Sequence, residues 1–217
     1  MGGGTAEVSD MRVFSIWAVM AMVLGLGGAA RADVFNLPHF VTSGEFAIGL
    51  EPELTLSNGA GFGANLRYTQ GLTDLFDVSG EIGTGGGPRQ FRVGGDLDLD
   101  IFPDVTGQPG IGLAGRALYV RVPTPGSAVP GDVSGTVELT LIPYIHKAFT
   151  TADKGMIDPF FSFPIGMSFF NGQYQGLATA VIGALIRGSD HFWYSTEFGI
   201  AVNNTNTYFA GGITYYH

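Results

Sequence analysis

The sequence contains no cysteine and carries little charge. The absence of cysteine from all 217 residues excludes disulfides and cysteine-ligated metal sites. Only 13% of the residues are charged, below the roughly 25% of ordinary soluble domains. Lysine occurs at two positions, Lys147 and Lys154. A β-sheet face in contact with water normally carries many lysines and glutamates, so this composition favours a surface that meets lipid.

The chain also lacks long apolar runs beyond its N-terminal region. After position 32 there is no uninterrupted apolar stretch of about 18 residues, the length that a helical membrane span requires. The overall composition is nevertheless apolar, with 45% hydrophobic residues. Glycine is abundant, at 35 residues, or about twice its usual share of roughly 7%. This combination favours a β-rich membrane protein or a soluble β-barrel with a large core.

The N-terminal region has the pattern of a secretory signal peptide. Met11-Arg12 precedes the apolar run Val13–Leu26, and Gly27–Ala32 supplies small residues for cleavage after Ala32. Residues 1–32 are therefore the predicted signal peptide. If translation starts at Met11, the signal peptide begins with Met11-Arg12 and has the basic N-terminal region that is typical of such peptides. Asp33–Ser43 has no clear period and is predicted to be a periplasmic lead-in segment before a barrel domain at 44–217.

The net charge argues against a nucleic-acid partner. The formal net charge is −9. Residues 1–32 carry two acids and two bases, so their removal leaves this value unchanged. An acidic chain has no electrostatic means of neutralising phosphates.

The segment Glu45–Ser57 alternates between polar and apolar residues almost without exception. Phe46, Ile48 and Leu50 share one face, whereas Glu51 and Glu53 lie on the other. A period of two indicates a β-strand. Similar alternating runs follow, separated by turn residues. The expected strands are 45–57, 62–71, 75–84, 90–101, 110–121, 133–146, 156–169, 175–187, 191–202 and 207–216.

Ten strands predict an all-β, antiparallel, up-and-down transmembrane β-barrel. An even strand number places both chain ends on the same side of a membrane. Eight or twelve strands remain open because some boundaries are ambiguous. Pro52, Pro143 and Pro164 fall inside expected strands, and each requires a bulge or a strand end because proline cannot donate to the ladder.

Aromatic residues lie towards the ends of the expected strands. Outer-membrane barrels carry such aromatic girdles at the two membrane interfaces. The expected girdle residues are Phe62, Tyr68, Phe91, Tyr119, Phe169, Phe192, Tyr194, Tyr208 and Tyr215.

The region Gly44–His217 resembles small bacterial outer-membrane β-barrel proteins at the level of pattern. The resemblance rests on the signal peptide, the glycine-rich amphipathic strands, the turn Gly71–Asp74 and the final segment Thr207–His217. It implies a Gram-negative outer-membrane location, contact with outer-membrane lipid and lipopolysaccharide, insertion by the barrel assembly machinery, and a monomer. The last strand resembles the signal that this machinery reads, through Gly212, Tyr215 and His217, although His217 stands where Phe or Trp is favoured.

Charged residues on the polar faces are expected to meet inside the barrel. Antiparallel partners have a constant index sum set by the turn, so turn positions predict which residues face each other. The expected pairs are Glu51–Arg67, Glu53–Asn65, Asn65–Glu81, Glu81–Arg92, Asp96–Arg116 and Arg116–Glu138. Unpaired charges in a narrow interior are costly. The predicted lumen network comprises Glu51, Arg67, Glu81, Arg92, Asp96, Arg116, Glu138 and Glu197.

Such a network favours a filled lumen and hence a structural or anchoring role, or a very narrow channel, without a catalytic site, cofactor or metal. Two alternatives stay open. One is a membrane-embedded hydrolase or lipid-modifying enzyme that uses His191, Ser195 and Glu197, but His191 and Glu197 would be about 20 Å apart along a strand. The other is a secreted soluble ligand-binding barrel. The acidic run Asp96–Asp100 spreads its carboxylates too far for a closed calcium cage.

Overall fold

The computed structural model describes residues 41–57, 60–86, 90–123, 133–151 and 155–217. The predicted signal peptide and residues 33–40 of the lead-in segment lie outside this part of the chain. Within it, no helix is long and apolar enough to cross a membrane.

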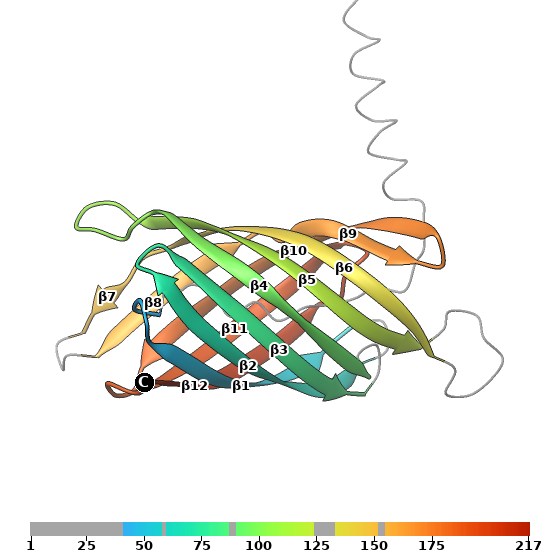
Figure 1. Ribbon diagram of the computed structural model, residues 1–217, viewed down its shortest axis with the longest axis horizontal. Coiled ribbons are helices and arrows are strands. Elements are labelled where there is room, and N and C mark those ends of the chain that lie inside the picture. The colour runs from blue at the N-terminus through green and yellow to red at the C-terminus, as the bar shows by residue number, and fades with distance from the viewer. Residues whose placement is uncertain (1–40, 58–59, 87–89, 124–132, 152–154) are drawn as a thin grey trace, which may run out of the picture.

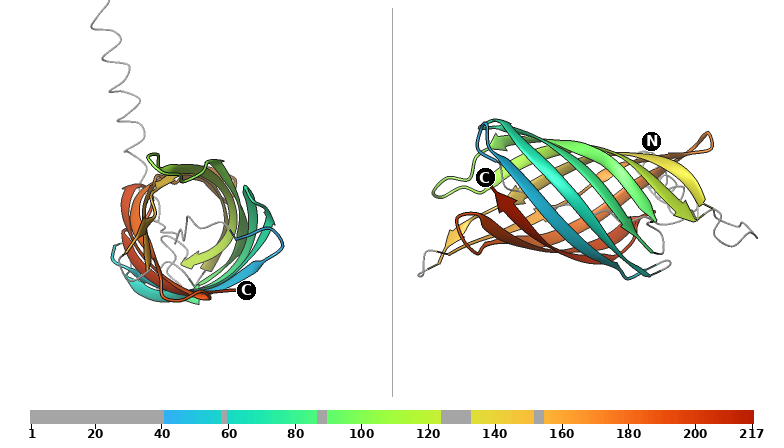
Figure 2. Two further views of the ribbon diagram at one scale, coloured as in Figure 1. Left: turned by 90° about the vertical axis from the view of Figure 1, so that its left-hand side faces the viewer. Right: turned by 60° about the horizontal axis from the view of Figure 1, so that its bottom comes forward.

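The described chain is a ring of antiparallel strands joined by hairpins (Figure 1). The strands are β1 (Phe46–Thr55), β2 (Gly61–Thr73), β3 (Phe76–Gly85), β4 (Phe91–Phe102), β5 (Gly110–Pro123), β6 (Val133–His146), β7 (Phe149–Thr150), β8 (Met156–Ser162), β9 (Ile165–Phe170), β10 (Gln173–Arg187), β11 (Phe192–Asn203) and β12 (Tyr208–Tyr216). β12 pairs with β1 and closes the ring, as the view along the barrel shows (Figure 2).

The wall has ten strand positions, which confirms the predicted fold class and strand number. β8 and β9 together occupy one position, because each pairs with β6 on one side and β10 on the other. β7 is a two-residue addition beside β8. The strand expected at 156–169 is thus divided between Ser162 and Ile165.

The three prolines within expected strands lie where the ladder is interrupted. Pro164 falls in the break between β8 and β9, and Pro143 on β6 faces the same break, where its carbonyl accepts a hydrogen bond from Phe163 N at 3.1 Å. Pro52 lies in β1, where pairing to β12 is interrupted between Leu50 and Glu53. Each proline therefore avoids a ladder position that would need its missing N–H.

The register of most hairpins differs by two residues from the expected one. Glu51 faces Asn65 instead of Arg67, and Arg67 faces Glu81. In the same way Glu53 faces Gly63, Asn65 faces Gly83, Glu81 faces Gly94, and Arg116 faces Thr140, so these expected pairs are wrong. Asp96 faces Arg116 as expected. The turns are centred one residue away from the estimate, which moves the index sum by two and leaves every side chain on its expected face.

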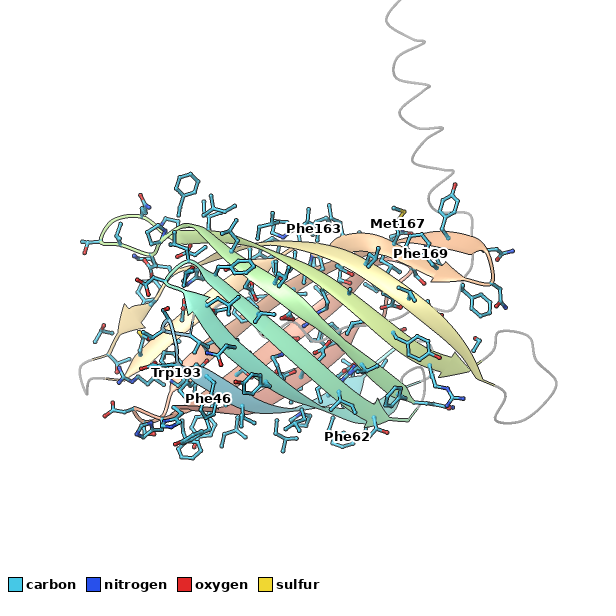
Figure 3. The ribbon with its side chains drawn as sticks, viewed as in Figure 1. Phe46, Phe62, Phe163, Met167, Phe169 and Trp193 are labelled. Atoms are coloured by element: carbon cyan, nitrogen blue, oxygen red, sulfur yellow. The ribbon has the colours of Figure 1, made fainter. Side chains whose placement is uncertain are left out.

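The outer wall is apolar and the inner wall is polar. Phe62 is 64% exposed and Ile82 is 50% exposed, whereas Glu51 is 1% exposed. Phe62, Met167 and Phe169 point away from the barrel (Figure 3). This is the arrangement of a membrane β-barrel, and it disagrees with the soluble alternative, which needs the apolar faces inside.

The aromatic residues of the expected girdle face outward, with one exception. Tyr208 is fully buried in the lumen, so the prediction that it belongs to the girdle was wrong. Tyr208 and Tyr215 lie an odd number of residues apart on β12. Because strand side chains alternate, only one of them can face lipid, and Tyr215 does so.

Candidate functional site: the charged lumen

Arg67 is the centre of the lumen network. It projects inward from β2 and contacts carboxylates from three other strands: Nε is 2.9 Å from Glu51 Oε1, Nη2 is 2.8 Å from Glu81 Oε2, and Nη1 is 2.5 Å from Asp96 Oδ2. Arg67 is 6% exposed. A planar guanidinium with five N–H donors can serve several carboxylates at once, which a lysine ammonium does less well.

Arg116 extends this network from β5. Its Nη2 is 3.1 Å from Asp96 Oδ2 and 3.7 Å from Glu81 Oε2. Asp96 therefore accepts from two arginines, one on either side of its own strand. The charges of β1 to β5 are connected through these shared carboxylates.

Arg92 forms a second group by reaching across two strands. From β4 it donates to Glu53 Oε2 on β1 at 2.9 Å, and its Nε contacts Asn65 Oδ1 on β2. The strand between them, β3, carries Gly83 at this level, and a Cβ there would overlap both Asn65 and Arg92. The glycine leaves the space that the long side chain crosses.

We call these residues the arginine belt, because the arginines bind carboxylates from β1, β3 and β4. Its members are Arg67, Arg92, Arg116, Glu51, Glu53, Asn65, Glu81 and Asp96. Removing one partner from a buried ion pair leaves an uncompensated charge, at a cost of about 3–5 kcal/mol. The belt therefore holds the strands on this side of the barrel in fixed relative positions.

The other two residues of the predicted network also face the lumen. Glu197 faces the lumen from β11 and accepts a hydrogen bond from the Tyr208 hydroxyl at 3.0 Å. Glu138 is buried on the inner face of β6, at 4% exposure. Nothing in the alternating pattern indicated Tyr208 as a partner for Glu197, because the pattern alone does not place one strand against another.

A second group of buried side chains inside the barrel is apolar and aromatic. A buried cluster joins β5, β6, β8, β10 and β12 and consists of Ala114, Ile142, Tyr144, Phe160, Val181, Tyr208 and Ala210. The belt and this cluster together occupy the interior. Sequence reasoning missed the cluster because these residues share the face that otherwise carries polar groups.

Further acidic residues lie on the inner wall at the end where β1 begins and β12 ends. Asp77 on β3 and Asp98 on β4 face each other directly, and Asp100 follows on β4. We call Asp77, Asp98 and Asp100 the acidic cluster. Nearby, His146 Nδ1 is 2.9 Å from Asp158 Oδ2. The aspartate run on β4 was visible in the sequence, but its meeting with Asp77 depends on the register.

Beyond the strands of the wall, hydrogen bonds connect the loop between β4 and β5 to the loop after β6. Lys147 Nζ donates to Asp104 Oδ1, to Val105 O at 2.8 Å and to Gln108 O at 3.0 Å. Burial acts to raise the pKa of Asp104, but hydrogen bonds from Lys147 and from the Ala148 N–H at 2.7 Å outweigh it, so the pKa lies below its usual value.

The residues named for the enzyme alternative do not converge. Ser195 and Glu197 lie on β11, whereas His191 precedes that strand. His191 is exposed, stacks on the outward-facing Tyr215 with ring centroids 5.8 Å apart, and has its Nδ1 3.0 Å from Tyr216 O. These three side chains therefore provide no shared proton-transfer site.

The residues of the predicted assembly signal lie on and beyond β12. Gly212 is within the strand, Tyr215 faces outward, and His217 follows the strand. The His217 ring packs edge-on against Phe46 at 4.9 Å, and the backbones of these two residues exchange hydrogen bonds across the β1–β12 closure.

An open hollow lies at the wall formed by β3 to β6, β9 and β10, where Leu97, Leu139 and Met167 surround Gly95 and Gly115. Its floor is low because the two glycines carry no side chains. The lining residues come from both faces of the wall, because Leu97, Leu139 and Met167 face outward whereas Asp96, Arg116 and Leu177 are buried on the lumen face.

Comparison with known proteins gives fold-level likeness only. No protein family and no curated protein matches the chain. The COG4313 outer membrane channel from Pseudomonas putida F1 is 11% identical, with 85% of this chain and 99% of that chain covered and a TM-score of 0.49. The beta domain of the Bordetella autotransporter Brka is 14% identical, with 81% and 100% covered and a TM-score of 0.41. A structure described as "De novo design of transmembrane beta-barrels" is 11% identical, with 82% and 100% covered and a TM-score of 0.36.

Proposed function

We propose that the protein is a small integral outer-membrane barrel with a structural or anchoring role, whose lumen passes at most water and small ions. The observation that carries this proposal is Arg67, which projects into the lumen and joins carboxylates from β1, β3 and β4. A barrel of ten strands is little wider than the eight-stranded size that side chains fill. With the apolar cluster also inside the barrel, little room is left for a solute.

The proposed surroundings follow from the outer wall. The apolar face is in contact with outer-membrane lipid, and lipopolysaccharide covers the outer leaflet. The signal peptide is cleaved near Ala32, and the barrel assembly machinery inserts the chain by reading Gly212, Tyr215 and His217 of the last strand. The barrel functions as a monomer without a nucleic-acid partner.

Conductance measurements on planar bilayers test the filled lumen. The unaltered barrel is expected to show no stable large conductance. Arg67→Ala is expected to raise conductance, because it removes the buried side chain that holds the carboxylates of β1, β3 and β4 together inside the lumen. Arg187→Ala is the matched control, since Arg187 lies at the end of β10 and pairs with the exposed Asp190. A large, stable conductance in the unaltered protein would contradict the proposal.

Membrane embedding is tested separately. The folded protein should show heat-modifiable migration on gels and should resist extraction by urea or carbonate. Extraction as a soluble protein would contradict the outer-membrane assignment.

A further inference from the structure

The acidic cluster brings three carboxyl groups together without an ion-pair partner among the described residues. Asp77 and Asp98 are 2% and 8% exposed and lie directly opposite each other. Like charges in this arrangement destabilise a sheet. Asp77 Oδ2 accepts a hydrogen bond from Val41 N at 2.9 Å. Oδ1 of Asp77, of Asp98 and of Asp100 has no hydrogen-bond partner within the described part of the chain.

Tyr144 directs a second kind of oxygen towards the same place. On the inner wall Asp100 faces Gly112, and Gly112 faces Tyr144. The tyrosine ring lies over Gly112, where any side chain would overlap the ring and its hydroxyl. The hydroxyl interacts electrostatically with all three aspartates of the cluster. Tyr144 is 3% exposed, and its hydroxyl has no hydrogen-bond partner among the residues described.

The basic groups nearest to the cluster already bind other acids. Arg67 donates to Glu51, Glu81 and Asp96, and Arg116 donates to Asp96, although both arginines attract Asp98 electrostatically. On the other side, His146 binds Asp158. The three carboxyl groups of the cluster therefore form no ion pair with a basic side chain of the described residues, although His146 also interacts electrostatically with Asp100.

We propose that the acidic cluster binds a hydrated divalent cation, of the Mg²⁺ type, with the Tyr144 hydroxyl contacting its water shell. The available atoms are carboxylate and hydroxyl oxygens, which suit a hard cation. No three His, Asp or Glu side chains of the described residues are placed to ligate one ion directly. An ion held here keeps much of its water, as Mg²⁺ does when it binds through one or two carboxylates. This inference goes beyond the proposed function and does not require that ions cross the barrel.

The test compares the thermal unfolding of the full chain, folded in detergent micelles, in EDTA, in MgCl₂ and in NaCl of matched ionic strength. Heat-modifiable gel migration reports the folded fraction. The unfolding midpoint is expected to rise with Mg²⁺ and to saturate, because an ion that binds only the folded state stabilises it. In EDTA, Asp98→Asn should raise the midpoint by relieving repulsion. The same variant should require about 10- to 100-fold more Mg²⁺ for the stabilising response.

Further variants separate a local site from a general effect. Tyr144→Phe keeps the ring and removes only the hydroxyl, so it should fold and respond more weakly to Mg²⁺. Asp190→Asn removes an exposed carboxylate at the same end of the barrel and should respond like the unaltered protein. Equal effects of MgCl₂ and NaCl, or an unchanged Mg²⁺ response in both Asp98→Asn and Tyr144→Phe, would overturn the proposal. A stabilising response to CaCl₂ at a far lower concentration than to MgCl₂ would contradict the proposal that the bound ion keeps much of its water. Because unfolding is measured without conductance, these outcomes are independent of the test of the filled lumen.

Discussion

The arginine belt and the acidic cluster bury carboxylates on the same inner wall in different ways. Asp96 and Asp98 lie two residues apart on β4 and face the same lumen. Asp96 contacts two arginines, whereas Asp98 contacts no basic group in the described chain and faces Asp77. The difference shows that position in the barrel, and not residue type, decides whether a buried acid forms ion pairs with arginines.

The largest expected effect comes from removing the centre of the belt. Arg67→Ala removes the arginine that binds Glu51 and leaves Glu81 and Asp96 with Arg116 as their remaining arginine contact, so the barrel should lose about 3–5 kcal/mol of folding stability. Denaturant unfolding followed by gel migration measures the loss. Arg187→Ala should change stability by less than about 1 kcal/mol, because its ion pair is exposed. Similar losses for both variants would remove the distinction between belt and surface.

Matched substitutions on β4 test the comparison directly. Asp96→Asn should destabilise the barrel by about 2–4 kcal/mol, because it weakens charge-assisted hydrogen bonds to Arg67 and Arg116. Asp98→Asn, measured in EDTA, should leave stability unchanged or raise it. If both substitutions destabilise equally, the acidic cluster is as well compensated as the belt.

Gly83→Ala tests whether the path of Arg92 depends on empty space above β3. A methyl group there overlaps Asn65 and Arg92, so we expect a loss of about 1–3 kcal/mol, the usual cost of overpacking. Gly80→Ala is the control on the same strand, because its Cβ would face outward and lie 4.0 Å from the nearest atom, Gly94 O. Unfolding of the two variants side by side should show the difference, and equal stability would mean that Arg92 can be accommodated elsewhere.

The smallest effect is expected at Asp104, outside the wall. Its pKa is lowered in the folded protein, so its contribution is fully present above the unfolded pKa of about 3.9 and is lost as the pH falls through the folded pKa. The change should stay below about 1 kcal/mol, as for most ion pairs near the protein surface. Unfolding midpoints between about pH 6 and pH 2 should fall less in Asp104→Asn than in the unaltered protein. An identical pH profile in the variant would assign the loss to other acids.

The period of two was enough to predict the fold from the sequence. It placed Leu50 outside and Glu51 inside without any knowledge of neighbouring strands, because alternation is a property of each strand alone. The prolines indicated where strands would be irregular, but not which type of irregularity each proline would cause. Pro164 divides a strand, whereas Pro52 remains within β1.

The contacts inside the lumen could be predicted only in part. Arg67 was expected beside Glu51, and the side chains do meet, although their backbones are offset by two residues. A long side chain compensates for that offset. The Arg92–Glu53 contact could not be predicted, because it crosses two strands and depends on the gap at Gly83. The Asp77–Asp98 contact required the correct register, which turn residues do not fix to within two positions.

The closure of the ring between β1 and β12 has a consequence for assembly. The two strands come from opposite ends of the barrel domain and share no turn, so no local geometry sets their alignment. Bringing them together carries the loop-closure entropy of nearly the whole domain. A register shift of two residues would leave every side chain on its correct face, so the alternating pattern alone does not exclude it. The mutual hydrogen bonds of Phe46 and His217 and the edge-on packing of their rings mark the correct alignment at the chain terminus. A shifted register would separate Phe46 from His217 and remove these contacts, so they favour the observed alignment of β1 and β12.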